Sequence, residues 1–385
     1  MKRIILTSIS IVLVLVMTSS CSLFGGKKTV TSQTASETQT VSQTAKGDTK
    51  TDTDTTSVTQ STLTSQNAAG TTAGTTGKMA TATTTKPTTI KAPTDPPPMS
   101  ALVALGHNIK TIGATVKSPN TNTTYKLVFI DDFNGTALNS DNWTVFTKNY
   151  NAAEEQVNIP ENIEVKGGYL YIHGKKESVS RSGQATDGSW HTSNYTGGAI
   201  NSNGKKTFQF GRIEMKAKMP YSQGMWPAFW TMGVKRGWPW GGEIDIVEMV
   251  GGNDQWNNKN RDGQVHSGIH WCRPEATSDT AYSSDHKSTG GEFDIPERYM
   301  GGKLADDYHV FGVEWTSTSM MFYLDDVMFK EISITDTTMR EAFFQKHFMI
   351  INLAIGGSWA GSPDSHSKTV WPQKLMVDWV KVWQK

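Results

Sequence analysis

Short stretches in which apolar and polar residues alternate follow one another from about residue 120 to the end of the chain. In residues 212–219, RIEMKAKM, the charged side chains share one face of a strand and the apolar ones share the other. Gly, Asn, Asp and Pro separate the stretches, and only residues 337–346 suggest a helical turn or two. Asp325–Asp326 in YLDDVMF indicates a tight hairpin. Many short strands with turn signals predict an all-β sandwich or barrel.

Composition divides the chain unevenly. All 13 tryptophans lie at or after Trp143, so we expect one globular domain, residues 123–385. Residues 22–98 are rich in Thr, Ser, Gln and Gly and poor in large apolar residues, which predicts a disordered linker. It is either a spacer through a cell envelope or neutral filler. Residues 99–122 form a lead-in of undetermined role. The net charge of +1 argues against a nucleic-acid partner.

The N-terminus has the pattern of a secretory signal, residues 1–21. Lys2 and Arg3 precede a short apolar run that ends in MTSSC. Small residues before Cys21 resemble the lipobox of bacterial lipoproteins, which implies a secreted protein lipid-anchored at the cell envelope or cell surface. The alternative is an ordinary signal peptide with an incidental cysteine. In either case Cys272 has no partner in the mature protein, so we expect no intrachain disulfide.

Three acids interrupt an otherwise aliphatic strand in GGEIDIVEMVGG, residues 241–252. Glu243 and Asp245 are two residues apart and therefore share a face. Glu248 is five residues from Glu243, and strict alternation would send it to the opposite face. One bulged residue at Ile246–Val247 would restore the phase. We therefore expect a bulge that puts all three carboxylates on one face.

Three neighbouring carboxylates repel one another, so one of them should keep a proton. A protonated acid beside an ionised one suits glycoside cleavage, and a retaining mechanism needs the two carboxyls about 5–5.5 Å apart. The outer two, Glu243 and Glu248, have the reach for this, which leaves Asp245 an auxiliary role. The alternatives are a cation site and a solvated strand edge.

GGEIDIVE is similar to the bulged signature E-x-D-x-x-E of glycoside hydrolase family 16. DDFNG, FGRIEMKAKMP, GMWPAFW, INLAIGG and MVDWVKVW match that family in order. The laminarinase-like members resemble this chain most. The resemblance implies a β-jelly-roll sandwich of two curved antiparallel sheets with a concave substrate cleft. It also implies a monomeric enzyme that needs no cofactor for catalysis and cleaves internal β-1,3 bonds of β-glucan with retention.

Other substrates and one other function stay open. A mixed-linkage β-1,3-1,4-glucan, or a galactan such as agarose or carrageenan, would suit the same chemistry, and hydrolysis or transglycosylation could follow. A non-catalytic β-glucan-binding module is the alternative from another class. We expect the lipid anchor to be the only membrane contact.

By the same resemblance, Glu243 is the nucleophile, Glu248 is the acid/base and Asp245 tunes both. Side chains that match substrate-binding positions of the family, or share a strand face with one that does, are Glu214, Lys216, Trp226, Trp230, Trp238, His270 and Asn352. The family usually has arginine where Lys216 stands. For the tryptophans the alternative is core packing, and for His270 and Asn352 it is a structural hydrogen bond.

In VDWVKVW, alternation predicts that Asp378 shares its side with Val380 and Val382. An acid in such surroundings needs a partner. The resemblance suggests a structural calcium held by Asp378, Asp132 and the backbone carbonyl of Gly168, because oxygen ligands suit that ion. The alternative is a carboxylate that is hydrogen-bonded or paired with an arginine.

Overall fold

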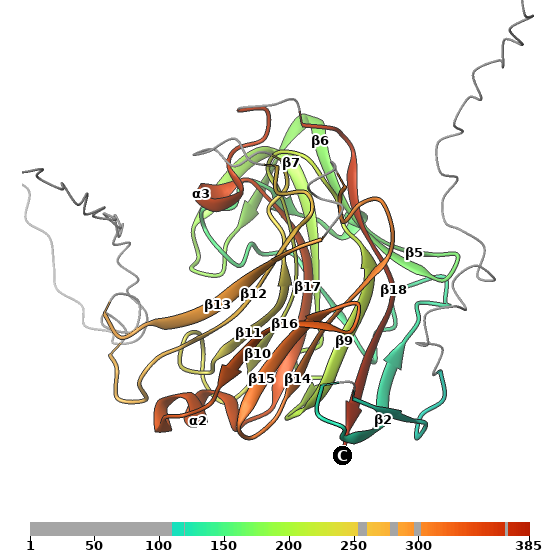
Figure 1. Cartoon of the computed structure of the whole chain (residues 1–385). Coiled ribbons are helices and arrows are strands. Elements are labelled where there is room, and N and C mark those ends of the chain that lie inside the picture. Colours follow the sequence, from blue (N-terminus) through green and yellow to red (C-terminus); the bar gives the residue numbers. More distant parts are fainter. Residues whose placement is uncertain (1–109, 119, 253–259, 278–283, 296–301, 366–368) are drawn as a thin grey trace, which may run out of the picture. The chain divides into compact units, whose positions relative to one another are not determined.

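The computed structural model describes residues 110–118, 120–252, 260–277, 284–295, 302–365 and 369–385. These residues form two layers of antiparallel strands, as the jelly-roll prediction requires (Figure 1). Sheet A consists of β1 (Thr115–Lys117), β2 (Thr124–Asp131), β5 (Ile163–Lys166), β6 (Tyr169–Gln184), β9 (Gly211–Lys218), β14 (His309–Trp315), β15 (Ser319–Leu324), β16 (Val327–Ser333) and β18 (Gln373–Gln384).

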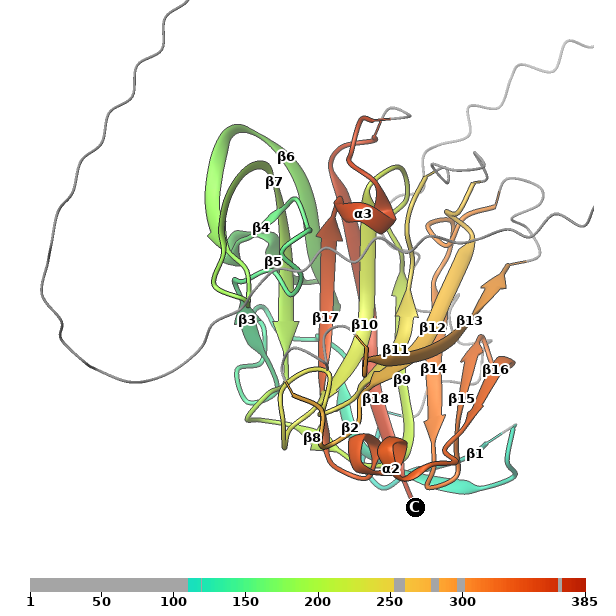
Figure 2. The same cartoon turned by 90° about the vertical axis from the view of Figure 1, so that its left-hand side faces the viewer.

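Sheet B consists of β3 (Thr144–Phe146), β7 (Trp190–Asn201), β8 (Thr207–Phe208), β10 (Met225–Gly233), β11 (Glu243–Glu248), β12 (Gln264–Trp271), β13 (Lys287–Asp294) and β17 (His347–Ile355). Its central order is β13–β12–β11–β10–β17–β7 (Figure 2). The short β4 (Val157–Asn158) pairs with β7 in parallel. Beyond sheet B, β7 pairs with β6 as a two-stranded ribbon.

The core lies between the two sheets. On β9, Ile213 and Met215 face it, while the charged residues between them face the other way, as the alternation predicts. Ile244 on β11 and Ile351 and Leu353 on β17 meet them from sheet B. Each such side chain contributes roughly 1.5–3 kcal/mol when fully buried. The outer faces of both sheets are therefore free to carry polar side chains.

Local sequence signals explain the shorter elements. α2 (Thr337–Phe343) begins where Asp336 accepts a hydrogen bond from the Met339 amide at 2.8 Å, so the predicted helical turns are confirmed. The β15–β16 hairpin turns at Asp325 and Asp326, whose φ angles of 49° and 64° suit a tight turn of the expected kind. Among the described residues, the remaining helical turns are η2 (Pro160–Asn162) and α3 (Gly357–Ala360).

The described part of the lead-in belongs to the sandwich. β1 pairs with β2, and Val116 packs against the outer cluster of Tyr125 and Leu127 on sheet A. Ser118 donates to Glu314 at 2.5 Å. The fold therefore starts before residue 123. The predicted signal peptide, linker and Cys21 lie outside the described residues.

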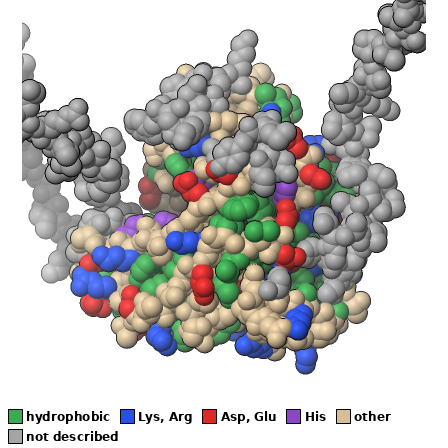
Figure 3. Space-filling model, viewed as in Figure 1, with side chains coloured by type: hydrophobic (Ala, Val, Ile, Leu, Met, Phe, Trp, Pro, Cys, Tyr) green, Lys and Arg blue, Asp and Glu red, His purple; other side chains and the backbone are tan. Residues whose placement is uncertain are grey.

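Two surface observations bear on partners. Within the described ranges no helix has the length and apolar character needed to cross a membrane. The face shown in Figure 3 carries acidic and basic side chains side by side, without a broad patch of one sign. This mixture agrees with the net charge of +1.

The expectation that Asp378 shares a face with Val380 and Val382 is wrong. The pairing of β18 with β9 shifts between Val377 and Trp379, so Asp378 sits in a bulge. Val377, Val380 and Val382 still face the core, but the bulged Asp378 reaches Lys216 on the outer face of sheet A.

Candidate active site

A bulge in β11 brings three carboxylates to the outer face of sheet B. Glu243 and Asp245 pair with Met232 and Trp230 of β10, and Glu248 pairs with Ala228. The registers with β10 and with β12 both shift between Asp245 and Glu248. The predicted bulge at Ile246–Val247 is therefore confirmed. Ile244, Ile246 and Val247 face the core on the other side.

Burial and mutual repulsion control the protonation of these acids. Burial raises the pKa of Glu248 to about 7. Burial and then the charge of Glu248 raise the pKa of Glu243, and burial followed by both neighbouring charges holds the pKa of Asp245 well above its usual range. Asp245 is only 3% exposed and shares a hydrogen bond with Glu243. If Asp245 keeps its proton, it donates a hydrogen bond to Glu243, and the negative charge stays on Glu243.

Two tryptophans donate to the outer acids. The Trp226 indole Nε1 lies 2.9 Å from Glu248 Oε1. Trp238 hydrogen-bonds to Glu243. Both bonds favour the ionised form of the acid that accepts them, and so moderate the effect of burial. The structure brings both predicted tryptophans to the carboxylates, as hydrogen-bond donors in addition to any stacking role.

Trp230 of β10 and Asn352 of β17 form a hydrogen-bonded pair on the β10 side of the acids. Trp230 Nε1 donates to Asn352 Oδ1 at 2.7 Å, and both are buried on the outer face of sheet B. The Tyr150 ring meets Trp230 edge-on at 4.8 Å between centroids. Tyr150 in turn receives a bond from Asn201 of β7 at 3.1 Å. Aromatic and amide groups therefore extend from the acids across β10 and β17 to β7.

His270 lies on the opposite flank of the acids. Its Nε2 is 3.4 Å from Asp245 Oδ2, and its Nδ1 is 2.9 Å from His286 Nε2. Burial, with a smaller effect of His286, lowers the pKa of His270 to about 4, so the ring is neutral at neutral pH. Burial also lowers the pKa of His286. The Trp238 ring lies 5.0 Å from that of His286.

Sequence reasoning missed His286 and Trp359. His286 directly precedes β13, in a loop whose sequence shows no period. Trp359 lies on the four-residue helix α3 and packs edge-on against Trp226 and His266, at 5.3 and 4.8 Å. His266 is the cross-strand partner of Glu248. The only available signal for Trp359 is its position just after the INLAIGG stretch that contains Asn352.

The same cluster has the donors of a cation site. Ligand atoms of Glu243, Asp245 and His270 all lie within 4.8 Å of one another. The cation site considered in the sequence analysis therefore involves the same carboxylates as the catalytic site. A bound cation would occupy the carboxylates that a glycoside hydrolase needs.

Glu214 and Lys216 do not belong to this site, and the prediction that they bind substrate in the cleft is wrong. They lie on β9 of sheet A, and their side chains face away from the core on the opposite side of the sandwich. Glu214 is fully buried and receives bonds from Arg212 and from the Tyr323 hydroxyl, the latter at 2.8 Å. The alternation of charged and apolar residues correctly predicted that Glu214 and Lys216 share a face, but it did not reveal that their strand belongs to sheet A.

Of the three proposed calcium ligands, Asp378 lies in β18, and Asp132 and Gly168 lie just outside β2 and β6, the strands that pair with β18. Val380 of β18 pairs with Asp131, next to Asp132, and Val377 pairs with Leu170, close to the Gly168 turn. Their oxygen donors are of the type that calcium prefers. Each carboxylate already has an ammonium neighbour, because Lys216 Nζ is 3.1 Å from Asp378 and Lys110 Nζ is 3.8 Å from Asp132.

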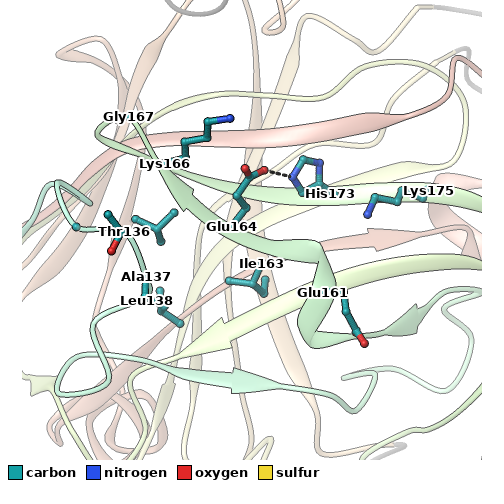
Figure 4. Close-up of a pocket in the computed structure, with 12 residues that line it drawn as sticks. Thr136, Ala137, Leu138, Glu161, Ile163, Glu164, Lys166, Gly167, His173 and Lys175 are labelled. Carbon is teal, nitrogen blue, oxygen red and sulfur yellow. Dashed lines mark hydrogen bonds and ion pairs between the residues drawn. The ribbon is translucent and has the colours of Figure 1, made fainter.

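A separate hollow of about 790 Å³ lies over β5 and the start of β6 (Figure 4). Glu164 and His173 meet in it at 3.0 Å, and Leu138, Lys166 and Lys175 also line it. Its lining contains none of the acids of β11, so it is not part of the site described above.

Comparison with known proteins connects this arrangement to polysaccharide hydrolases. A family model described as β-porphyranase A–D, GH16 domain, matches residues 127–385. Glucan endo-1,3-β-glucosidase A1 of Niallia circulans is 27% identical over 281 residues, which cover 67% of this chain and 38% of that protein. β-Glucanase of Rhodothermus marinus is 28% identical over 235 residues, 58% of this chain and 71% of that one.

Among solved structures, the endo-β-1,3-glucanase of Pyrococcus furiosus is similar with a TM-score of 0.57 and 26% identity. The match covers 70% of this chain and 97% of that one. This chain spans well under half the length of the Niallia circulans protein. The shared part is therefore the sandwich that carries the acids of β11.

Proposed function

Because this chain belongs to glycoside hydrolase family 16, as its match over residues 127–385 shows, we propose that it is an endo-acting hydrolase of β-1,3-glucan. One observation supports this most: the bulge in β11 returns Glu248 to the face of Glu243 and Asp245. A bulge that only completed the core would not need three acids on its outer side. The names of the relatives from Niallia circulans and Pyrococcus furiosus support β-1,3-glucan as the substrate.

The proposed mechanism retains the configuration of the anomeric carbon. Glu248 gives its proton to the glycosidic oxygen while the Glu243 carboxylate attacks C1, and the bond from C1 to the leaving oxygen breaks. A glycosyl ester on Glu243 results. Glu248, now ionised, removes a proton from water, whose oxygen attacks C1 and releases Glu243. Asp245 donates a hydrogen bond to Glu243 throughout, which stabilises its charge before attack and after release.

Trp230, Trp226 and Trp238 would hold sugar rings around the scissile bond. Trp230 pairs with Asp245 in the register of β10 and β11. Trp226 and Trp238 donate hydrogen bonds to Glu248 and Glu243. His270 and Asn352 add polar groups on either flank. Indole faces and convergent polar groups suit a neutral sugar chain.

A second candidate substrate is porphyran, because the matching family model is described as a β-porphyranase domain. Mixed-linkage glucan, agarose and carrageenan remain alternatives of the same chemistry. A non-catalytic glucan-binding module would not need the hydrogen bond between Asp245 and Glu243.

Two further proposals concern the setting of the domain. We propose that Cys21 carries a lipid that anchors a secreted protein at the cell envelope, supported by the sequence MTSSC after a short apolar run. We also propose that Asp378, Asp132 and the Gly168 carbonyl hold calcium, supported by the pairing of β18 with β2 and β6, next to which Asp132 and Gly168 lie. Labelled palmitate incorporated into the wild type but not into Cys21→Ala would test the anchor.

The substrate experiment compares laminarin, lichenan, porphyran and agarose and identifies the oligosaccharides released. We expect internal cleavage of laminarin first. Glu243→Ala should be inactive, and azide should restore part of its activity, because a small anion can occupy the vacated space and attack C1. No release from any of the four would contradict the enzyme assignment, and release from porphyran alone would replace the glucan proposal.

A further inference from the structure

The ribbon of β6 and β7 extends beyond sheet B and ends in a turn at residues 185–189. It stands beside β17 at one end of the sheet that carries the acids (Figure 2). Gln184 pairs with Trp190 at the turn, and Ser182 pairs with Thr192 next to it. This ribbon plays no part in the mechanism above.

Trp190 is the exception among the tryptophans. Of the 12 that lie within the described residues it alone is exposed, at 71%. An indole on the surface forgoes the hydrophobic stabilisation of burial. One exposed apolar residue needs no explanation by itself, so the side chains around it decide what it indicates.

Next to the turn, the strand positions on the face that carries Trp190 are polar and uncharged; farther along this face Thr196 bonds the Glu177 carboxylate at 2.9 Å. Alternation and pairing give the face hydroxyl and amide groups: Ser180, Ser182, Gln184, Thr192 and Asn194. Ser182 and Thr192 hydroxyls lie 3.0 Å apart, and Gln184 donates to the Gly188 carbonyl at 3.1 Å. These contacts hold the polar groups beside the indole.

The opposite face of the ribbon is docked on the domain. His191 contacts the Gln156 carbonyl at 2.6 Å, and the Tyr195 ring stacks on Trp371 at 5.4 Å. Lys176, which pairs with Tyr195, forms an ion pair with Asp364 at 2.6 Å. Docking on that side fixes the Trp190 face toward solvent.

We propose that Trp190 and its five polar neighbours form a second binding site, for the neutral polysaccharide chain that the active face cleaves. The C–H face of a sugar ring stacks on the indole, and its hydroxyls exchange hydrogen bonds with the Ser, Thr, Asn and Gln side chains. The uncharged side chains next to Trp190 match a ligand without charge. This proposal rests on the proposed function.

Strand β7 connects this site to the outer face of sheet B, where the acids of β11 lie. The strand begins at Trp190 and passes through Ala199, which pairs with Asn352 on β17. Nine residues at about 3.3 Å each give at most about 30 Å between the two positions. We expect a short oligosaccharide in the active site to fall short of Trp190, whereas a polymer can occupy both sites and gain from the high local concentration.

The test compares Trp190→Ala with Val179→Ala, which removes an equally exposed apolar side chain, at 71%, from the same ribbon. Binding to laminarin is measured by affinity electrophoresis in a Glu243→Gln background, and kcat/KM is measured for laminarin and laminaritetraose with Glu243 intact. We expect Trp190→Ala to weaken laminarin binding about five- to tenfold and to leave kcat/KM for the tetraose unchanged. Val179→Ala should change neither.

Equal laminarin binding by Trp190→Ala and its Glu243→Gln parent would overturn the site. So would an equal loss in Val179→Ala, or a loss of tetraose cleavage, which would show a general disturbance of the domain. Sedimentation of the wild type as a dimer that Trp190→Ala dissociates would assign the face to a second copy of the chain instead. Failure of the Glu243-intact parent to cleave the tetraose would count against the proposed function alone, because the electrophoresis needs no turnover.

Discussion

Trp226 donates its indole N–H to Glu248 at 2.9 Å, across the paired strands β10 and β11. This bond favours the ionised carboxylate and opposes the effect of burial, which raises the pKa of Glu248 to about 7. Loss of the donor should therefore raise that pKa further. Trp226→Phe keeps a ring and removes the donor.

We expect Trp226→Phe to move the alkaline limb of kcat/KM upward by about one pH unit, since a hydrogen bond to a charged group contributes about 1.5 kcal/mol. Glu248 then stays protonated to higher pH. Trp230→Phe is the matched control, because its indole donates to Asn352 instead. A pH profile measured on laminarin checks this, and an equal shift in both variants would contradict it.

His286 should act on the acids through His270. Without His286, the Nδ1 of His270 loses its partner and the pKa of His270 rises from about 4, because His286 contributes to its lowering. A cationic His270 beside Asp245 favours loss of the Asp245 proton. The acid limb of kcat/KM should then move to higher pH.

We expect His286→Ala to show this shift and to lose about tenfold in kcat/KM, the size of effect that follows when a buried polar group loses its partner. His286→Gln, which keeps a hydrogen-bonding side chain, should recover much of the loss. A reduced rate with an unchanged pH profile would indicate a packing role only.

Glu154 links stability to pH. Burial raises its pKa to about 7, although Gln156 Nε2 donates to it at 2.6 Å and the Asn151 amide at 3.0 Å. A carboxyl with a raised folded-state pKa contributes stability that is complete below its unfolded pKa of 4.5 and is lost as pH rises through 7. Glu154→Gln removes this titration.

We therefore expect the free energy of unfolding of the wild type, relative to Glu154→Gln, to fall by about 3 kcal/mol between pH 4 and pH 8. Urea unfolding of both proteins at each pH measures the difference, and any constant offset from altered hydrogen bonds cancels. A difference that does not vary with pH would show that Glu154 is ionised in the fold.

Calcium, if bound as proposed by Asp378, Asp132 and Gly168, should stabilise the sandwich. An ion at 100 times its Kd contributes about 2.7 kcal/mol, so chelation should lower Tm by several degrees and added calcium should restore it. Asp378→Asn should not respond to chelator. An unchanged Tm of the wild type with excess chelator would leave Lys216 as the cation that balances Asp378.

The comparison of sequence and structure shows what alternation can and cannot predict. The spacing of Glu243 and Glu248 signalled its own bulge, because only a bulge returns the second acid to the face of the first. The bulge at Asp378 had no such signal, since valines occur on both sides of it. Alternation placed Glu214 with Lys216 correctly but could not say which sheet they belong to.

Loop residues escape such reasoning for another reason. His286 contacts His270 and Trp238, and Trp359 contacts Trp226 and His266, from segments between strands whose local sequence has no period. The exposure of Trp190 also escapes such reasoning. The pairing of β6 with β7 shows which face of the ribbon carries Trp190, but only the structure shows that the opposite face is docked on the domain. Alternation therefore predicts the face of a residue in a regular strand, but not an unsignalled bulge such as that at Asp378, nor the contacts between distant segments.

The central claim is that Glu243 is the nucleophile of a retaining hydrolase. Proton NMR of the product formed in the first minutes from laminarin tests it most directly, because the anomer released by the enzyme precedes mutarotation. Retention predicts the β-anomer first, followed by slow appearance of the α-anomer. An α-anomer formed first would show inversion and would contradict the assignment of Glu243 and Glu248 to nucleophile and acid/base.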